Sequence, residues 1–203
     1  MTAQEVLAQA VERHHPRLVM ACSFQKEESV LIDMLMEIEP SARVFTIDTG
    51  VLFPETYDVW RKVEERYGLS VEVQDASGSW SAENCCGTAK VDGLNRALEG
   101  AEAWITGIRR EQSPTRADTQ HVERDEARGI WKFNPLAEWT EKDVWRYLNE
   151  RELPYNPLHD QGYASIGCAP CTQPGSGREG RWAGTDKTEC GIHVVAPSAS
   201  EHR

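Results

Sequence analysis

Short apolar runs alternate with helical patterns along most of this 203-residue chain, and that alternation limits the folds it can adopt. The runs that have the length and composition of buried strands lie at residues 17–21, 43–47, 70–73 and 103–106. Strands that alternate with helices form a mostly parallel sheet covered by helices on both faces, a Rossmann-like α/β fold. We therefore expect a single domain over residues 1–196, followed by a polar tail over 197–203.

Helix boundaries can be read from capping residues and from helix breakers. Helical spacing predicts helices over residues 2–14 and 55–67, and Gly68 closes the second. Another helix is expected to begin after Thr140, which suits the N-cap because Asp143 occupies the third helical position. That helix is expected to run to about Arg151. Beyond it, the chain from Tyr155 onward is rich in Gly and Pro and contains three cysteines, so we expect an irregular segment with a functional role.

Polar loops follow three of the expected strands. They contain residues 22–28, Asp48 to Gly50, and Gly107. Ligands of parallel α/β sheets bind beyond the carboxyl ends of the strands, so these loops predict a site at that edge. The loop 22–28, which leads into a further helix, lacks glycine and so is neither a Walker-type phosphate loop nor a dinucleotide-binding loop.

The formal net charge of −11 argues against a nucleic-acid partner or an anionic membrane, which would require a basic face. No apolar run approaches the roughly 20 residues that span a bilayer, and the N-terminal residues lack a signal-peptide pattern, so we expect a cytoplasmic protein. Basic residues nevertheless gather near the expected site, where guanidinium groups would match phosphate or sulfate oxygens. They are Lys90, Arg109, Arg110, Arg116, Arg178 and Arg181.

Four of the six cysteines form two close pairs, the adjacent Cys85 and Cys86 and the CxxC pair Cys168 and Cys171. Four thiolates suit zinc or an iron–sulfur cluster. Adjacent cysteines point in different directions, which suits the separated iron corners of a cubane better than one tetrahedral zinc. The spacing favours a cluster and leaves zinc open.

Cys190 lies between Glu189 and Gly191, shortly before His193. A thiolate nucleophile needs nearby cations and access to its substrate, which a glycine-flanked segment beside arginines could give. The alternative is an incidental exposed thiol near the chain end. Cys22, which directly follows an apolar run, is expected to be a small buried thiol.

Several segments, taken in order, resemble the assimilatory adenylyl-sulfate reductases of bacteria. They are TIDTGVLFPET (46–56), CCGTAKV (85–91), TGIRREQS (106–113), KFNPL (132–136), SIGCAPCT (165–172), REGRW (178–182) and ECGIH (189–193). The resemblance extends over nearly the whole chain and implies an adenine nucleotide α-hydrolase-like fold of the pyrophosphate-loop type.

The resemblance also implies roles for individual residues. The ligands of a [4Fe–4S] cluster would be Cys85, Cys86, Cys168 and Cys171. The adenosine pocket would be lined by Ser23, Phe24, Thr49, Leu52 and Gly107. The phosphosulfate would be contacted by Lys90, Arg116, Arg178, Arg181 and His193. Cys190 would be the nucleophile.

The implied reaction is the reduction of adenosine 5′-phosphosulfate to sulfite and AMP in sulfate assimilation. Cys190 attacks sulfur, an S-sulfocysteine forms, and thioredoxin or a similar dithiol then releases sulfite. No thioredoxin-like domain is recognisable in the sequence, so we expect the reductant to act in trans. Thr88 and Ala89 stand where the family often has a second basic residue, and Gly93 replaces a frequent proline; both departures are expected to weaken substrate affinity.

Three alternatives remain open. Lys26, in the first loop, could accept the 3′-phosphate of 3′-phosphoadenosine 5′-phosphosulfate, which would then be the substrate. An ATP-using ligase or sulfurtransferase of the pyrophosphate-loop class should carry a Ser-Gly-Gly-like loop, which the residues after Ser23 do not match. A zinc-stabilised binding module without catalysis is the third. The sequence does not fix the oligomeric state, and a homo-oligomer stays open.

Overall fold

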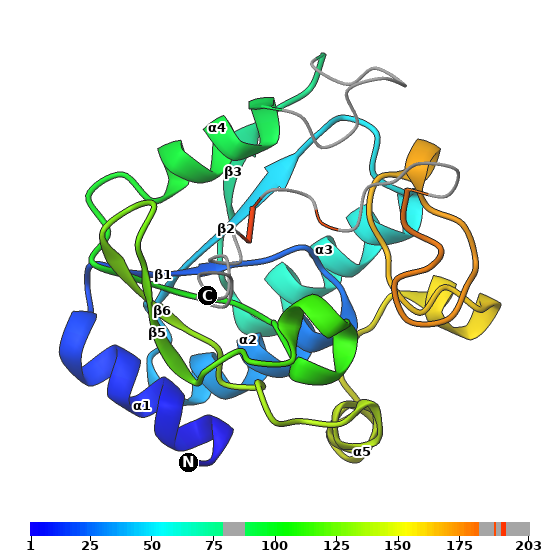
Figure 1. The fold of residues 1–203 in the computed structure, drawn as a ribbon. Helices are drawn as coiled ribbons and strands as arrows, with labels where there is room; N and C mark the ends of the chain where they lie inside the picture. Colours follow the sequence, from blue (N-terminus) through cyan, green and yellow to red (C-terminus); the bar gives the residue numbers. More distant parts are fainter. Residues whose placement is uncertain (79–87, 183–188, 190–191, 194–203) are drawn as a thin grey trace, which may run out of the picture.

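A six-stranded sheet forms the centre of the computed structural model, which describes residues 1–78, 88–182, 189 and 192–193. Neighbouring strands pair in parallel, except for the antiparallel hairpin of β5 and β6 (Figure 1). The order across the sheet is β3 (Glu72–Asp75), β2 (Arg43–Asp48), β1 (Leu18–Ala21), β4 (Ala103–Ile105), β6 (Ile130–Phe133) and β5 (Val122–Asp125). The mostly parallel sheet predicted from the sequence is confirmed.

Helices cover both faces of this sheet, as predicted (Figure 1). One face packs against α1 (Ala3–His14), α2 (Lys26–Ile38), α3 (Pro54–Tyr67) and α5 (Glu141–Glu150). The other face packs against α4 (Thr88–Ala97).

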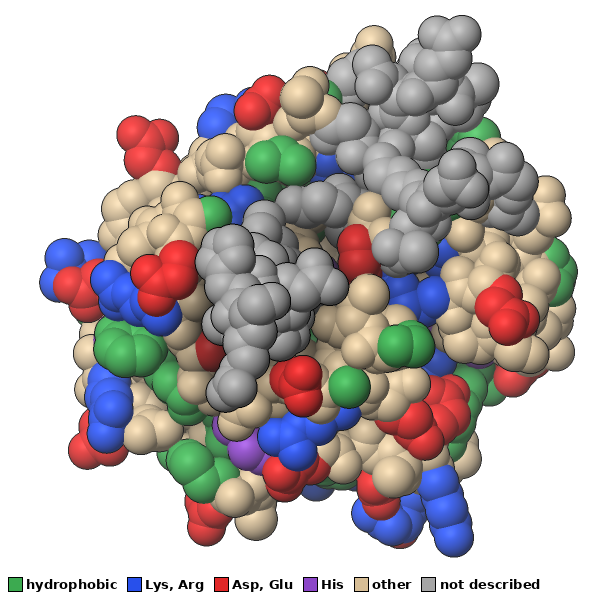
Figure 2. Space-filling view, viewed as in Figure 1, with side chains coloured by type: hydrophobic (Ala, Val, Ile, Leu, Met, Phe, Trp, Pro, Cys, Tyr) green, Lys and Arg blue, Asp and Glu red, His purple; other side chains and the backbone are tan. Residues whose placement is uncertain are grey.

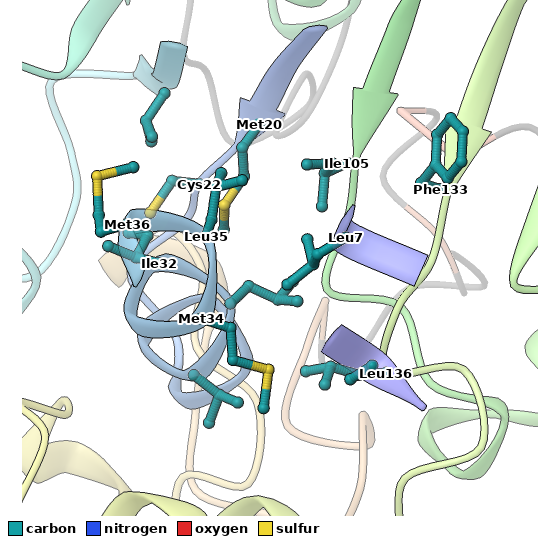
Figure 3. Close-up of a cluster of buried hydrophobic side chains, with 14 of the residues drawn as sticks. Leu7, Met20, Cys22, Ile32, Met34, Leu35, Met36, Ile105, Phe133 and Leu136 are labelled. Carbon is teal, nitrogen blue, oxygen red and sulfur yellow. The ribbon is translucent and has the colours of Figure 1, made fainter. Parts of the chain in front are cut away.

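The central strands bury side chains on both faces in strict alternation. In β4, Ile105 joins the cluster beneath α1 and α2, whereas its neighbour Trp104 joins the cluster beneath α4. In β1, Met20 and Val19 divide in the same way. Figure 3 shows Met20, Ile105 and Phe133 of the strands on the same side of the sheet as Leu7 of α1 and Leu35 of α2. Because successive strand residues point to opposite faces, a strand with both sets buried must lie in the interior of the sheet.

Several predicted boundaries hold, and others shift. The Thr140 hydroxyl accepts the N–H of Asp143 at 3.1 Å, which confirms the predicted N-cap. Gly68 closes α3 in the left-handed conformation, as predicted. The helix after β1, however, begins at Lys26, inside the predicted loop 22–28. The strand predicted over 70–73 lies at Glu72–Asp75.

The irregular segment after α5 is confirmed, and it folds back onto the loop between β2 and α3. It contains the short 3₁₀ turns η3 (Pro157–Gln161) and η4 (Ala169–Cys171). Ala169 donates its N–H to the carbonyl of Val51 at 2.9 Å, and Cys168 forms a β-bridge with Leu52. The CxxC pair therefore lies beside the carboxyl end of β2. Within the described parts of the chain, no helix is long and apolar enough to cross a membrane.

A buried carboxylate ties three helices together beneath the sheet. Asp33 of α2, only 4% exposed, accepts hydrogen bonds from the hydroxyls of Tyr67 in α3 at 2.8 Å and Tyr147 in α5 at 2.9 Å. Arg151 Nε lies 2.6 Å from the same carboxylate. Burial, together with these contacts to Asp33, raises the pKa of both tyrosines above their usual range.

We predict that Asp33→Ala lowers the free energy of unfolding by about 3 kcal/mol, because it leaves two partly buried hydroxyls and a guanidinium without their buried acceptor. Urea denaturation followed by circular dichroism measures the change. The matched control is Asp58→Ala, which removes an exposed carboxylate paired with Arg61 and should cost under about 1 kcal/mol. Equal losses in the two variants would contradict the role assigned to Asp33.

Candidate active site

A cavity of about 400 Å³ opens at the carboxyl edge of the sheet, between the ends of β1 and β4. In the sheet, β2 and β3 lie on one side of β1, whereas β4 and β6 lie on its other side, so the strand order reverses between β1 and β4. Such switch points are the usual ligand sites of open α/β sheets. Ser23 after β1 and Gly107 after β4 line the cavity. Its volume lies in the range of small-molecule sites.

The segment between β1 and α2 wraps around a buried carboxylate. Glu28 Oε2 accepts a hydrogen bond from Ser23 Oγ and another from the N–H of Gln25, both at 3.1 Å. Burial, together with the neighbouring charge of Glu27, raises the pKa of Glu28 to about 8, although the two hydrogen bonds oppose this shift. A Cβ at Gly107 would lie 2.6 Å from Glu28 Oε1, so glycine is needed where the two strand ends meet.

One end of the cavity is bordered by a buried network of ion pairs. Arg109, 3% exposed, donates from Nη2 to Glu27 Oε1 at 2.9 Å and to Glu141 Oε2 at 2.6 Å. Its Nη1 donates to Glu111 Oε2 at 3.0 Å. Lys26 Nζ lies 3.2 Å from Glu141 Oε1 and donates to the carbonyl of Ala164 at 2.9 Å. The cationic side chains of this network are thus already paired with carboxylates.

The other end of the cavity is rich in arginine. Arg116 donates from Nε and Nη2 to the two carboxylate oxygens of Glu189, each at 2.9 Å. Arg178 Nη2 donates to Glu189 Oε2 at 3.1 Å. In Figure 2, acidic and basic side chains are interspersed over the part of the surface that is not grey. An anionic ligand would therefore be attracted by a local cluster of arginines and not by the surface as a whole.

Arg181 is held at the same end by its neighbours in the irregular segment. Its Nη1 donates to Ser165 Oγ and to the carbonyl of Ile166, both at 3.2 Å, and its guanidinium lies 4.6 Å from the ring centroid of Trp182. A Cβ at Gly167 would clash with Nη2 of Arg181. The guanidinium therefore occupies space that any other residue at position 167 would need.

His193 also lines the cavity, stacked on Trp104 with ring centroids 5.7 Å apart and an interplanar angle of 10°. Burial lowers the pKa of His193 well below its ordinary value, and the cationic side chains of Arg116 and Lys132 add to the shift. The imidazole is therefore neutral at physiological pH. Its Nδ1 is buried and has no hydrogen-bond partner within the described residues.

The structure brings most of the predicted substrate-binding residues together around this cavity. Those that line it are Ser23, Leu52, Lys90, Gly107, Arg116, Arg178, Arg181 and His193. Phe24 and Thr49 are not among the lining residues. Phe24 is 1% exposed and stacks on Trp60 at 5.2 Å between ring centroids, whereas Thr49 Oγ1 lies 3.2 Å from the sulfur of Cys168.

Half of the predicted cluster ligands can be placed. Cys168, a free thiol that is 1% exposed, and Cys171 are joined by a hydrogen bond from the Cys171 N–H to the Cys168 carbonyl at 3.2 Å. Cys171 is disulfide-bonded. Cys85, Cys86 and Cys190 lie outside the described residues. Among the residues that are described, no three His, Cys, Asp or Glu side chains are grouped to hold a metal ion.

The acidic residues of the cavity were not predicted from the sequence. Glu27 and Glu28 lie beside Lys26, and three consecutive charged residues are typical of a solvated loop, yet all three are at most 9% exposed. Arg109 was predicted to belong to the basic cluster, but not to be paired with carboxylates. Glu27 and Glu28 lie in the first turn of α2, the helix that follows the first strand, and that position beside the strand end could have indicated them.

The parallel sheet, the cavity at its switch point and the arginine-rich end define an α/β protein that binds an anionic small molecule. Residues 17–174 match the model of the phosphoadenosine phosphosulfate reductase domain, and the chain belongs to this family of enzymes. The resemblance seen in the sequence motifs is thereby confirmed.

Individual relatives agree with this membership. The adenosine 5′-phosphosulfate reductase of Geobacillus kaustophilus is 46% identical over 212 residues, which cover 95% of this chain and 90% of that protein. The phosphoadenosine 5′-phosphosulfate reductase of Gloeobacter violaceus is 44% identical over 96% of this chain and 89% of that protein. The crystal structure of the phosphoadenylyl-sulfate reductase of Candida auris, in a phosphate complex, superposes with a TM-score of 0.73 at 32% identity, covering 85% of this chain and 91% of that one.

The raised pKa of Glu28 predicts a pH dependence of stability. Between its ordinary value of 4.5 and about 8, the folded state holds the Glu28 proton while the unfolded state releases it, so stability falls as pH rises through this window. Glutamine cannot ionise. We therefore predict that the melting temperature of Glu28→Gln, relative to that of the wild type, rises steadily from pH 5 to pH 8. Parallel melting curves for the two proteins would contradict this prediction.

The close approach at Gly167 predicts a loss of anion binding. We predict that Gly167→Ala displaces the Arg181 guanidinium and weakens AMP binding about tenfold, as measured by calorimetry. Arg181→Lys should cause a similar loss, because lysine cannot reproduce the planar donor arrangement. If the two substitutions act through the same group, the double variant loses little more than either single variant. Additive losses would show that Gly167 acts elsewhere.

Proposed function

We propose that this protein reduces adenosine 5′-phosphosulfate to sulfite and AMP, with Cys190 as the nucleophile. The observation that carries the proposal is the arginine-rich end of a cavity at the sheet switch point, where Arg116 and Arg178 surround a carboxylate. Guanidinium groups so arranged suit phosphate and sulfate oxygens equally well. The name of the Geobacillus kaustophilus relative supports this choice of substrate.

In the proposed reaction, the Cys190 thiolate forms a bond to the sulfur of the phosphosulfate. The bond from that sulfur to the bridging oxygen breaks, and AMP leaves with its electron pair. One thiolate of a dithiol such as thioredoxin then attacks the Cys190 sulfur and expels sulfite, forming a mixed disulfide. The second thiolate of the dithiol attacks that bond and frees the Cys190 thiolate, so the dithiol is oxidised to a disulfide as the sulfur is reduced. We propose that this reductant is a separate protein in the cytoplasm.

The arginine-rich end would compensate charge in the first step. A thiolate that approaches a phosphosulfate brings together groups of like charge, which requires cations placed in advance. Arg116, Arg178 and Arg181 provide guanidinium groups, and Lys90 lines the same cavity. The neutral His193 imidazole could hydrogen-bond an oxygen of the substrate through Nδ1.

The cations at the other end of the cavity favour adenosine 5′-phosphosulfate over its 3′-phosphorylated form. Lys26, considered from the sequence as a 3′-phosphate acceptor, does not lie in the first loop: it belongs to α2, is 2% exposed and is engaged by Glu141 and the Ala164 carbonyl. Arg109 is engaged by three carboxylates. At that end of the cavity, a 3′-phosphate would therefore meet two cations, Lys26 and Arg109, that carboxylates already neutralise.

We also propose that Cys85, Cys86, Cys168 and Cys171 hold a [4Fe–4S] cluster. Cys168 and Cys171 fit such a group, since they present two soft sulfur donors on one turn and Thr49 places a hydroxyl 3.2 Å from the Cys168 sulfur. The Cys171 disulfide would have to be reduced first. When bound, the cluster would supply a fixed charge beside the substrate.

Turnover with purified thioredoxin and each nucleotide tests the proposed reaction. We predict that sulfite forms from adenosine 5′-phosphosulfate, and that kcat/KM for the 3′-phosphorylated nucleotide is at least about tenfold lower, because the extra phosphate gains no free cation. Cys190→Ser should release no sulfite, while Cys22→Ser serves as the matched cysteine control and should remain active. Equal or faster turnover of the 3′-phosphorylated nucleotide would reverse the substrate assignment.

Metal analysis of anaerobically purified protein tests the cluster. We predict about four irons per chain and a broad visible absorption band, both lost in Cys168→Ser and retained in Cys22→Ser. Stoichiometric zinc without iron would replace the cluster by a structural zinc site.

A further inference from the structure

The carboxylate of Glu189 occupies the arginine-rich end of the cavity. Both of its oxygens accept hydrogen bonds from Arg116 at 2.9 Å, and Oε2 also accepts one from Arg178 at 3.1 Å. Thr115 Oγ1 donates to Oε1 at 3.2 Å. The Glu189 side chain is 14% exposed, so these contacts are largely shielded from water. Together they form a bidentate, charge-assisted arrangement of the kind that also binds sulfate and phosphate.

The donors that hold Glu189 cannot serve a second anion in the same way. Arg116 uses its Nε and Nη2 edge for the carboxylate, and its Nη1 donates to Gln112 Oε1. One edge of a guanidinium accommodates one bidentate anion. A phosphate or sulfate group that used this edge of Arg116 would therefore have to replace the Glu189 carboxylate.

Glu189 carries a full negative charge at neutral pH. Burial alone would raise the pKa of its carboxyl group, but the hydrogen bond and charge of Arg116 and the charge of Arg178 outweigh that effect and lower it below the usual range. The nearby His193 contributes no positive charge, because burial lowers the pKa of its imidazole. The carboxylate and an incoming anion thus compete for the same two guanidinium groups.

We propose that Glu189 is a built-in competitor of the substrate, a carboxylate that binds Arg116 and Arg178 until the phosphosulfate oxygens displace it. The competing chemistry is that of a tetrahedral oxyanion, and only the identification of that anion with the substrate rests on the proposed function. The carboxylate keeps both guanidinium groups in place in the absence of substrate, at the expense of anion affinity. The exchange replaces one anion by another, so the arginines are neutralised in both states.

Equilibrium binding of AMP and of inorganic sulfate, measured by calorimetry without turnover, tests the proposal. Glu189→Gln replaces the charged competitor by a neutral one of the same shape. We predict that both anions bind about fivefold tighter to this variant, because a neutral amide competes less well for a guanidinium. The matched control is Glu138→Gln, which removes an exposed carboxylate paired with Arg110 and should leave both affinities unchanged.

A second variant separates charge from folding. Glu189→Asp keeps the charge but shortens the side chain by one methylene group, so the bidentate contact to Arg116 is lost and anion affinity should again increase. Unchanged or weaker anion binding in both variants, with wild-type melting temperatures, would overturn the proposal. Tighter anion binding in a protein that fails to release sulfite would uphold the competitor and remove only the proposed reaction. Sulfite release by the protein, without tighter anion binding in the two variants, would uphold the proposed reaction and remove the competitor role of Glu189.

Discussion

The guanidinium of Arg109 is almost completely removed from water, and it joins elements that are far apart in the chain. It contacts Glu27 at the start of α2, Glu111 in the 3₁₀ turn after β4, and Glu141 at the start of α5. A buried charge is costly unless its partners surround it, so these elements must meet in one arrangement. That arrangement borders the cavity at the switch point of the sheet, and the remaining groups of the site are placed relative to it.

The cavity thereby acquires two unlike ends. Near Arg109, cations and carboxylates pair with each other, and a ligand finds little uncompensated charge among the described groups. At the other end, Arg116 and Arg178 bind the carboxylate of Glu189, which belongs to the C-terminal segment and occupies the place of an anionic ligand. The asymmetry suits a molecule that carries its charge on one side only. A nucleotide with a charged 5′-substituent and unmodified ribose hydroxyls has that form.

The layout of the fold could be predicted from the sequence, because buried strands and helix caps leave local signals. The capping of α5 by Thr140 and the end of α3 at Gly68 are local in this sense. The burial of Lys26, Glu27 and Glu28 could not be predicted, since it depends on Arg109 and Glu141, which are distant in sequence. The gathering of the arginines near one site was predicted from their placement beside the expected site loops, whereas their assignment as phosphosulfate contacts came from motif resemblance.

The stacking of His193 on Trp104, with Ile192 packed against the same cluster, joins the C-terminal segment to the second face of the sheet. The side chains that cover the second face of the sheet come in part from α4 and in part from Ile192 and His193. A substitution that shrinks Trp104 would therefore loosen the hold of the sheet on the segment that contains His193.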